Sequence, residues 1–208
     1  MKRFEIITEA DARLLDYGET VELARGGHVT PLAQDTLRER RVTLAEEGRT
    51  PPDDASLAPR ASIRTLAVGS VADGNALRQG LMRVLRGRAL TVEDLGTDAT
   101  NPRDYPDVAA GVARLVACGA VDAGIVIDQT GMGSAIAANK IAGARAVMAT
   151  TELIARRSRQ ENGANVLTLG SELVTLEMAT AIVSAWLATP MRDREHIRRL
   201  ARVRDLEK

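Results

Sequence analysis

The chain has 208 residues, and its 28 Lys and Arg balance 28 Asp and Glu, so the formal net charge is +0 at pH 7. This length can bury a sizeable core, and the balanced charge argues against nucleic acid or a membrane surface as the main partner. Aromatic residues make up only 2% of the chain, which removes the stacking platforms that single-stranded nucleic acids need. We therefore expect an aliphatic core and a ligand held by hydrogen bonds and charge.

The first ten residues, MKRFEIITEA, are polar and charged where a signal peptide needs an apolar run, and no stretch reaches the ~18 apolar residues of a membrane helix. The single cysteine, Cys118, has no partner for a disulfide within the chain. The two histidines, His28 and His196, are isolated and show no metal-ligand spacing. These features predict a cytoplasmic protein with no bound metal.

Residues 1–47 are predicted to form a small N-terminal module. In the stretch ITEADARLL, Thr8 can cap a short helix, with Asp11 three residues later. A second helix is expected further along the module.

In TPLAQDTLRERRVTL, Thr30 followed by Pro31 is typical of a helix start. This helix is expected to end near Arg40, before the strand-like residues 42–44. The next segment, GRTPPDDASLAPR at 48–60, holds three of the seven prolines among charged and small residues, and this composition predicts a linker.

After the linker, residues 61–208 alternate short aliphatic runs with longer segments of helical period, which indicates parallel strands joined by helices. The expected strands are 64–70, 90–96, 123–128, 145–149 and 165–170. The expected helices are 74–86, 107–118, 133–140, 151–161, 173–188 and about 192–206. The pattern predicts an α/β fold, a three-layer sandwich around a five-stranded parallel, Rossmann-like sheet, with ligands outside the carboxyl ends of its strands.

The stretch IDQTGMGSAIAANK, after the third of these strands, is the most informative part of the chain. Gly131 and Gly133 permit a tight turn before a helix, and Asp128 and Thr130 stand at the strand end. Free backbone N–H groups at such a turn suit an anion or a developing oxyanion. The alternative is that the glycines serve packing alone and that Asp128 caps the loop.

Several motifs of the second part occur together and in order: AVGSVADGNALRQGL, DLGT at 94–97, DYP at 104–106, GIVIDQTGMGSAIAANKIAGARA, SRQENGANVLTLGS and a final arginine pair. With these motifs, the chain from Thr65 onward resembles the ribose-5-phosphate isomerase B family, which includes the two subunits of galactose-6-phosphate isomerase. The resemblance implies an aldose–ketose isomerisation of a phosphorylated sugar, of the ribose 5-phosphate/ribulose 5-phosphate type, through an enediolate. It implies no metal or redox cofactor. The substrate-binding residues implied are Tyr105, Gly131, Gly133, Asn162, Arg194 and Arg198.

The resemblance also shows departures at the catalytic positions. In the family the base is a cysteine at the end of the third strand, or a glutamate at the start of the next helix; here these positions hold Asp128 and Ser134. An aspartate at the first position is similar to one subunit of galactose-6-phosphate isomerase, whose partner subunit is thought to carry the cysteine. The family's Asp-His pair after the first strand is replaced by Val71 and Ala72.

The histidine that assists ring opening in the family is replaced by Glu161. We therefore expect three catalytic residues: Asp128 as the proton-transfer base, Thr130 beside the enediolate, and Glu161 as a second acid or base. The alternative for Glu161 is a solvated helix residue.

Arg194 and Arg198 are four residues apart, so they share one face of the last helix, and guanidinium groups suit phosphate oxygens. The alternative is that they only solvate a helix that is charged all round. For His196, which lies between them, a surface or structural role is expected.

Residues 1–47 are similar to N-terminal segments on enzymes of bacterial microcompartments, such as ethanolamine-utilisation cobalamin adenosyltransferases. This similarity implies that residues 1–47 dock to a shell or cargo partner, and that the protein is located inside such a compartment. The alternative is that residues 1–47 are an extension that stabilises a dimer. The family resemblance further implies a homo-oligomer, a dimer or tetramer, with sites built across the interface. A catalytically inactive sugar-phosphate-binding or scaffolding subunit is the alternative to an active isomerase.

Overall fold

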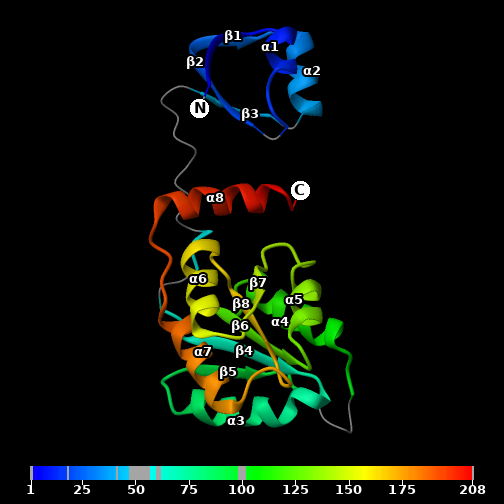
Figure 1. Ribbon diagram of the computed structural model, residues 1–208, viewed down its shortest axis with the longest axis vertical. Helices are drawn as coiled ribbons and strands as arrows, with labels where there is room; N and C mark the ends of the chain where they lie inside the picture. Colours follow the sequence, from blue (N-terminus) through cyan, green and yellow to red (C-terminus); the bar gives the residue numbers. More distant parts are fainter. Residues whose placement is uncertain are drawn as a thin grey trace. The chain divides into compact units, whose positions relative to one another are not determined.

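Figure 1 shows the computed structural model of the chain, which describes residues 2–17, 19–40, 42–46, 57–59, 62–97 and 102–207. The chain divides into two compact units, Met1–Asp53 and Asp54–Lys208. Of the segment 48–60 that the sequence predicts as a linker, residues 48–56 and 60 lie outside the described part. Residues 57–59 belong to the second unit.

The first unit is a three-stranded parallel sheet with two helices. Its strands are β1 (Arg3–Ile7), β2 (Thr20–Val29) and β3 (Thr43–Glu46), in that order, and its helices are α1 (Glu9–Arg13) and α2 (Pro31–Glu39). The predicted caps are confirmed: the hydroxyls of Thr8 and Thr30 accept the N–H groups of Asp11 and Ala33, each at 3.4 Å. A small core fills the unit: Ile7, Ala12, Leu15, Val21, Ala33 and Leu37.

The strands β1 and β2 are absent from the sequence-based expectation, and both have an irregular pattern. In β1 only Ile7 is buried. The register of β1 on β2 shifts between Phe4 and Ile6, opposite Gly26 and Gly27. A Cβ on Gly27 would lie 2.6 Å from the carbonyl oxygen of Glu5, so this glycine pair forms a bulge rather than a turn.

The second unit has the predicted α/β fold, with a five-stranded parallel sheet in the order β5-β4-β6-β8-β7. Its strands are β4 (Thr65–Ser70), β5 (Thr91–Asp94), β6 (Ala123–Asp128), β7 (Ala146–Met148) and β8 (Val166–Gly170). Its helices are η2 (Ala72–Gly74, a 3-10 helix), α3 (Asn75–Arg86), α4 (Tyr105–Ala117), α5 (Met132–Ala138), α6 (Glu152–Asn162), α7 (Leu176–Ala188) and α8 (Arg194–Asp205).

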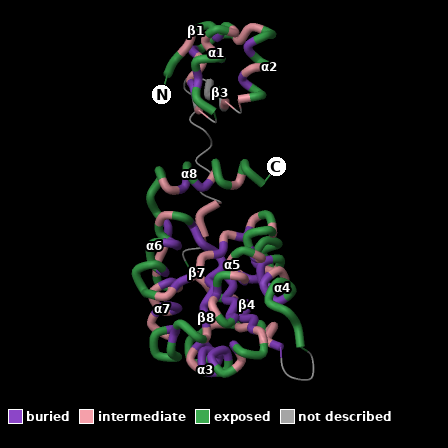
Figure 2. The backbone as a smooth tube through the Cα atoms, turned by 45° about the vertical axis from the view of Figure 1, so that its right-hand side comes forward, coloured by how far each residue is buried: buried purple, intermediate pink, exposed green. Residues whose placement is uncertain are grey.

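Helices cover both faces of this sheet, which makes three layers (Figure 1). Strand side chains such as Leu66, Ile125 and Leu167 pack with α3, α6 and α7 on one face. The intervening Ala67 and Val126 pack with α4 and α5 on the other face. Figure 2 shows the resulting burial of the strands. Within the described part of the chain, no helix is both long and apolar enough to cross a membrane.

The topology fixes where a ligand can bind. From β4 the chain passes to β5 on one side, and β6 then pairs on the other side of β4. The carboxyl ends of β4 and β6 therefore mark the topological switch point of the sheet, the place where ligands of doubly wound folds bind. The loop after Ser70 and the loop after Asp128 form its two sides.

Candidate functional site

The loop that follows β6 carries most of the predicted site, and Asp128 sets its geometry. This side chain is 6% exposed and its carboxylate accepts four hydrogen bonds. Its Oδ1 accepts the N–H of Thr130, at 2.8 Å, and the N–H of Gly131. Its Oδ2 accepts the N–H and the hydroxyl of Ser134, at 2.9 and 2.5 Å. Asp128 thus fastens the loop to the first turn of α5.

These bonds bear directly on the role of Asp128. A carboxylate has about four lone-pair sites, and all of them are used here. A general base must offer a lone pair to the proton that it removes, at a distance of ~2.6–3.2 Å. The four bonds favour the alternative, a carboxylate that caps the loop, while Asp128 as the base stays a prediction. Ser134 is fully buried and serves as a donor in this cap.

Gly131 and Gly133 are both required for close packing. Gly131 has φ +78°, and a Cβ there would lie 3.0 Å from the backbone of β8. A Cβ on Gly133 would lie 2.8 Å from the ring of Tyr105, so this ring covers the start of α5. The Thr168 hydroxyl also donates to the Gly131 carbonyl oxygen at 2.7 Å. The loop is held firmly against β8, with Tyr105 and Thr130 beside it.

The loop after β4 completes this edge of the sheet. The N–H of Val71 donates to the carbonyl oxygen of Ile127 at 3.1 Å, which holds η2 against the end of β6. Between the two loops, the side-chain amide of Gln129 donates to Oδ2 of Asp73 at 2.6 Å. Sequence reasoning missed this pair because its members are 56 residues apart. The available signal was the position of Asp73, three residues after a strand that ends at the switch point.

A buried arginine, Arg78, holds the residues on either side of η2 by hydrogen bonds. Arg78 in α3 donates from Nε to the Ser70 hydroxyl at 3.0 Å, from Nη2 to Asn75 Oδ1 at 2.6 Å, and from Nη1 to the carboxylate of Asp94. All three nitrogens of the guanidinium group therefore have protein acceptors. Arg78 acts as a structural cation that fixes Asn75, and through it the end of η2.

Glu161 and Asn162 lie at the other edge of the sheet. They end α6, which runs from the carboxyl end of β7 back to the amino end of β8. Asp128 pairs with Gly170, the last residue of β8, whereas α6 leads into Val166, the first. At ~3.3 Å per residue, the four steps from Val166 to Gly170 separate the two edges by roughly 13 Å. One chain therefore holds Asp128 and Glu161 in two separate half-sites.

The half-site at the amino edge contains a pocket of about 390 Å³. Glu161 and Asn162 line it together with residues of α8 that include His196, Arg199 and Val203. Glu161 forms an ion pair with Arg157, one turn earlier on α6. The Nδ1 atom of His196 is buried and has no hydrogen-bond partner within the described part of the chain. The ion pair allows either of the two roles that the sequence leaves open for Glu161.

Arg194 and Arg198 project away from this pocket. At 100° per residue they share one face of α8, and His196 and Val203, which line the pocket, lie on the opposite face. Both arginines are exposed. The exposed face of α8 that carries them is separate from the face that lines the pocket.

A family profile described as Ribose/Galactose Isomerase matches residues 66–203. The chain belongs to this family. Among its relatives, ribose-5-phosphate isomerase B of Escherichia coli is 41% identical over 145 residues, which cover 70% of this chain and 97% of the relative. A D-erythrulose-4-phosphate isomerase of Pectobacterium atrosepticum is 35% identical over 124 residues, which cover 59% and 82%. The solved structure of Clostridium thermocellum ribose-5-phosphate isomerase B matches with a TM-score of 0.66 and 38% identity, over 69% of this chain and 97% of that one.

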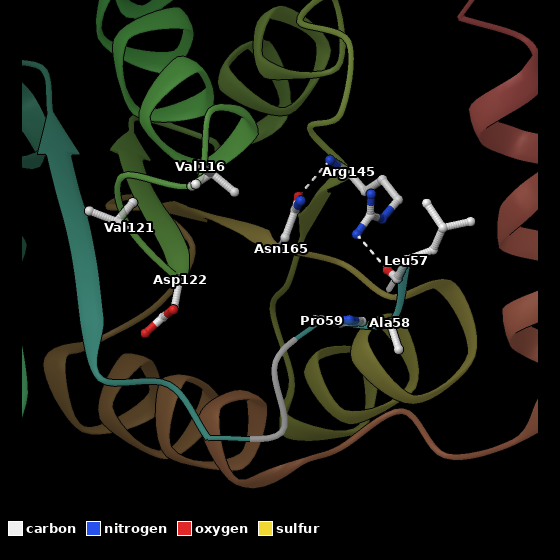
Figure 3. A pocket seen from close by; sticks show the side chains of 9 residues that line it. Leu57, Ala58, Pro59, Val116, Val121, Asp122, Arg145 and Asn165 are labelled. Carbon is white, nitrogen blue, oxygen red and sulfur yellow. Dashed lines mark hydrogen bonds between the residues drawn. The ribbon is translucent and has the colours of Figure 1, made fainter. Parts of the chain in front are cut away.

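This member of the ribose/galactose isomerase family has another pocket, of about 150 Å³, at the amino edge of its sheet (Figure 3). The Arg145 N–H donates to Asn165 Oδ1 at 2.7 Å, and Nη2 donates to the Leu57 carbonyl oxygen at 3.4 Å. Burial lowers the pKa of Arg145, and burial followed by the charge of Arg145 lowers the pKa of Arg159 to about 10. Three backbone carbonyl oxygens accept from the Arg145 side chain, and the one of Leu57 ties residues 57–59 to the rest of the unit.

The described residues contain no group of three or more His, Cys, Asp or Glu placed to hold a metal ion. The family profile starts at residue 66, so the first unit lies outside the matched region.

Proposed function

We propose that the chain isomerises a phosphorylated sugar between its aldose and ketose forms through an enediolate. The observation that carries the proposal is the rigid loop Asp128–Ser134 at the switch point, in a chain that belongs to the ribose/galactose isomerase family. The base takes the proton from C2 of the open-chain aldose, and the C–H electron pair forms the C1–C2 double bond. The proton of the C2 hydroxyl passes to O1, and the base returns its proton to C1. The product is the ketose, with no net change in atoms or electrons.

Thr130 is suited to stabilise the enediolate. Its Oγ1 accepts the N–H of Met132 at 3.3 Å, so its own proton is directed elsewhere and can be donated to a substrate oxygen. The first-turn N–H of Gly133 lies in the same turn, beside Tyr105. These groups supply donors where negative charge develops, while Asp128 holds the loop that carries them.

We propose that two copies of the chain complete each site. The separation of Asp128 from Glu161 by the length of β8 supports this, because the two half-sites meet only if one molecule supplies each. In this arrangement Asn162, Arg194 and Arg198 of the second molecule bind the phosphorylated end of the sugar. Apolar side chains also stand exposed beside the loop, namely Tyr105, Met132 and Ile136, as an interface requires.

Two substrate classes are candidates. Ribose 5-phosphate is the first, by analogy with the relatives named as ribose-5-phosphate isomerase B. D-Erythrulose 4-phosphate is the second, by analogy with the relatives of that name. The ion-paired Glu161, where the resemblance implies a ring-opening histidine, favours the second, since a sugar whose C4 oxygen carries phosphate cannot close a furanose ring.

The first unit is proposed as a docking element, inside a microcompartment if its partner is a shell or cargo protein. It has its own core, and it exposes Leu14, Tyr17 and Leu32. This role is independent of the isomerase chemistry.

The test is exchange of carbon-bound hydrogen in deuterated water. The purified full-length chain is incubated separately with ribose 5-phosphate and D-erythrulose 4-phosphate, and proton NMR follows deuterium entry at C1 or C2 together with product formation. We expect both with at least one substrate. Binding of these phosphates without exchange would instead support the alternative, an inactive sugar-phosphate-binding subunit.

A further inference from the structure

The proposed isomerisation needs a base at the carboxyl edge of the sheet, and Asp128 has no lone pair left for this role. The two positions that follow β4 offer no candidate, because Val71 and Ala72 carry no titratable group. We therefore looked for another carboxylate at the carboxyl ends of β4 and β6.

Asp73 meets this requirement. It lies in η2, after the carboxyl end of β4, and its Oδ2 accepts the Gln129 amide at 2.6 Å from the loop after β6. Its Oδ1 has no hydrogen-bond partner within the described residues, and the side chain is exposed. One oxygen is thus oriented by a donor, while the other keeps its lone pairs for a substrate proton. An oriented base of this kind is the arrangement that proton transfer needs.

The backbone that carries Asp73 is rigid. The N–H of the next residue, Gly74, donates to the Val71 carbonyl oxygen at 3.1 Å. A Cβ on Gly74 would lie 2.7 Å from the carbonyl oxygen of Ile127, so the turn is pressed against the end of β6. Arg78 holds the following Asn75 through its side chain. A fixed backbone holds the carboxylate beside the carboxyl ends of β4 and β6 rather than leaving it on a loose loop.

We infer that Asp73 is the proton-transfer base of this chain, an inference that rests on the proposed isomerase function. Asp73 Oδ1 removes the C2 proton of the open-chain aldose as the C1–C2 double bond forms, and the protonated carboxyl returns that proton to C1. The Gln129 amide orients the carboxylate and stabilises its ionised form before the first step and after the second. The Thr130 hydroxyl, next in the chain to Gln129, donates to the enediolate oxygen.

Glu161 is the rival carboxylate. It lies at the other edge of the sheet and reaches the switch point only from a second molecule, and Arg157 is already paired with it. Asp73 needs neither a partner nor the breaking of an ion pair. The two assignments differ in which variant loses proton transfer.

The experiment measures turnover, KM and deuterium entry for Asp73→Asn, with whichever of ribose 5-phosphate and D-erythrulose 4-phosphate the wild-type chain converts. We expect kcat and exchange to fall together by about 10²–10⁴-fold, the usual contribution of a positioned base, with KM within about threefold. Asp73→Glu, which keeps a carboxylate, should recover part of the loss. Asp35→Asn, an exposed aspartate of the first unit, is the matched control and should match the wild type.

Each other outcome gives a distinct answer. If Asp73→Asn keeps wild-type exchange, or raises KM with kcat unchanged, Asp73 is not the base and the inference is overturned. Loss of exchange in Glu161→Gln, with Asp73→Asn active, assigns the base to Glu161. If the wild-type chain itself exchanges no carbon-bound hydrogen with either sugar phosphate, the proposed function fails, and that result is separate from any effect of the variant.

Discussion

Replacement of Asp128 by asparagine separates a carboxylate that holds the loop from one that moves a proton. In Asp128→Asn, one oxygen still accepts the N–H groups of Thr130 and Gly131. The new NH₂ group then faces the N–H of Ser134, and two donors cannot bond to each other. The Ser134 hydroxyl can rotate to accept from the NH₂ group, so the net loss is one buried acceptor.

A buried N–H left without an acceptor costs about 1–3 kcal/mol, and Ser134 is fully buried. For a domain of this size, each kcal/mol lowers Tm by about 2–4 °C, so the variant should melt about 2–12 °C below the wild type. Turnover should fall as well, because the loop loses its fixed shape. If Asp128 acted only as a base, the variant would lose turnover but keep the wild-type stability.

Trp186 provides the assay. It is the single tryptophan of the chain, it is fully buried, and it lies in α7 of the second unit, so its fluorescence reports the unfolding of that unit alone. Thermal and urea unfolding of Asp128→Asn are compared with Asp73→Asn, an exposed change expected to stay within about 0.5 kcal/mol of the wild type. If Asp128→Asn is as stable as the wild type and yet exchanges no carbon-bound hydrogen, the lone-pair argument is refuted and Asp128 is the base.

Three further predictions concern binding, assembly and the domain boundary. Arg198→Ala should weaken binding of a phosphorylated sugar by roughly 10- to 100-fold in calorimetry, the loss of a charge-assisted bond, and unchanged affinity would remove it from the phosphate site. Ile136→Glu, at a side chain 64% exposed beside the loop, should turn a dimer into a monomer in sedimentation at micromolar concentration; a wild-type chain that is already monomeric contradicts the shared site. A chain that starts at Ala61 should unfold about 1–3 kcal/mol more easily than one that starts at Asp54, because it lacks Leu57, which packs beside Met191 on the second unit. Equal stability would show that residues 57–59 contribute nothing.

The sheet of the second unit could be predicted because buried parallel strands are continuous aliphatic runs. The stretches AGIVID and NVLTLG are buried at every position of β6 and β8, and turn residues bound them. The predicted helix starts differ from the observed ones by a few residues. Asp104 precedes the helix that begins at Tyr105, two residues earlier than expected, and Thr175 caps a helix that begins at Leu176, three residues later.

The sheet of the first unit could not be predicted in the same way. In β1 a single buried residue leaves no alternation to detect. In β2 the pair Gly26-Gly27 is typical of a turn, yet a backbone oxygen of the neighbouring strand lies where a Cβ of Gly27 would be. Only the pairing of two strands makes that glycine necessary, and pairing is not a local property of the sequence.

The candidate site shows the same limit for chemistry. The loop after β6 could be recognised in the sequence, and so could the two possible roles of Asp128 as base or cap. Residue types alone do not show how many hydrogen bonds the Asp128 carboxylate accepts. The count depends on three backbone N–H groups and one hydroxyl that converge only after the loop folds. A carboxylate saturated in this way holds the shape of the loop, and in the proposed function another group moves the proton. The proposed reaction then needs a second carboxylate on the same edge, and within the described residues Asp73 offers one with a free oxygen, a donor on the other oxygen and a fixed backbone.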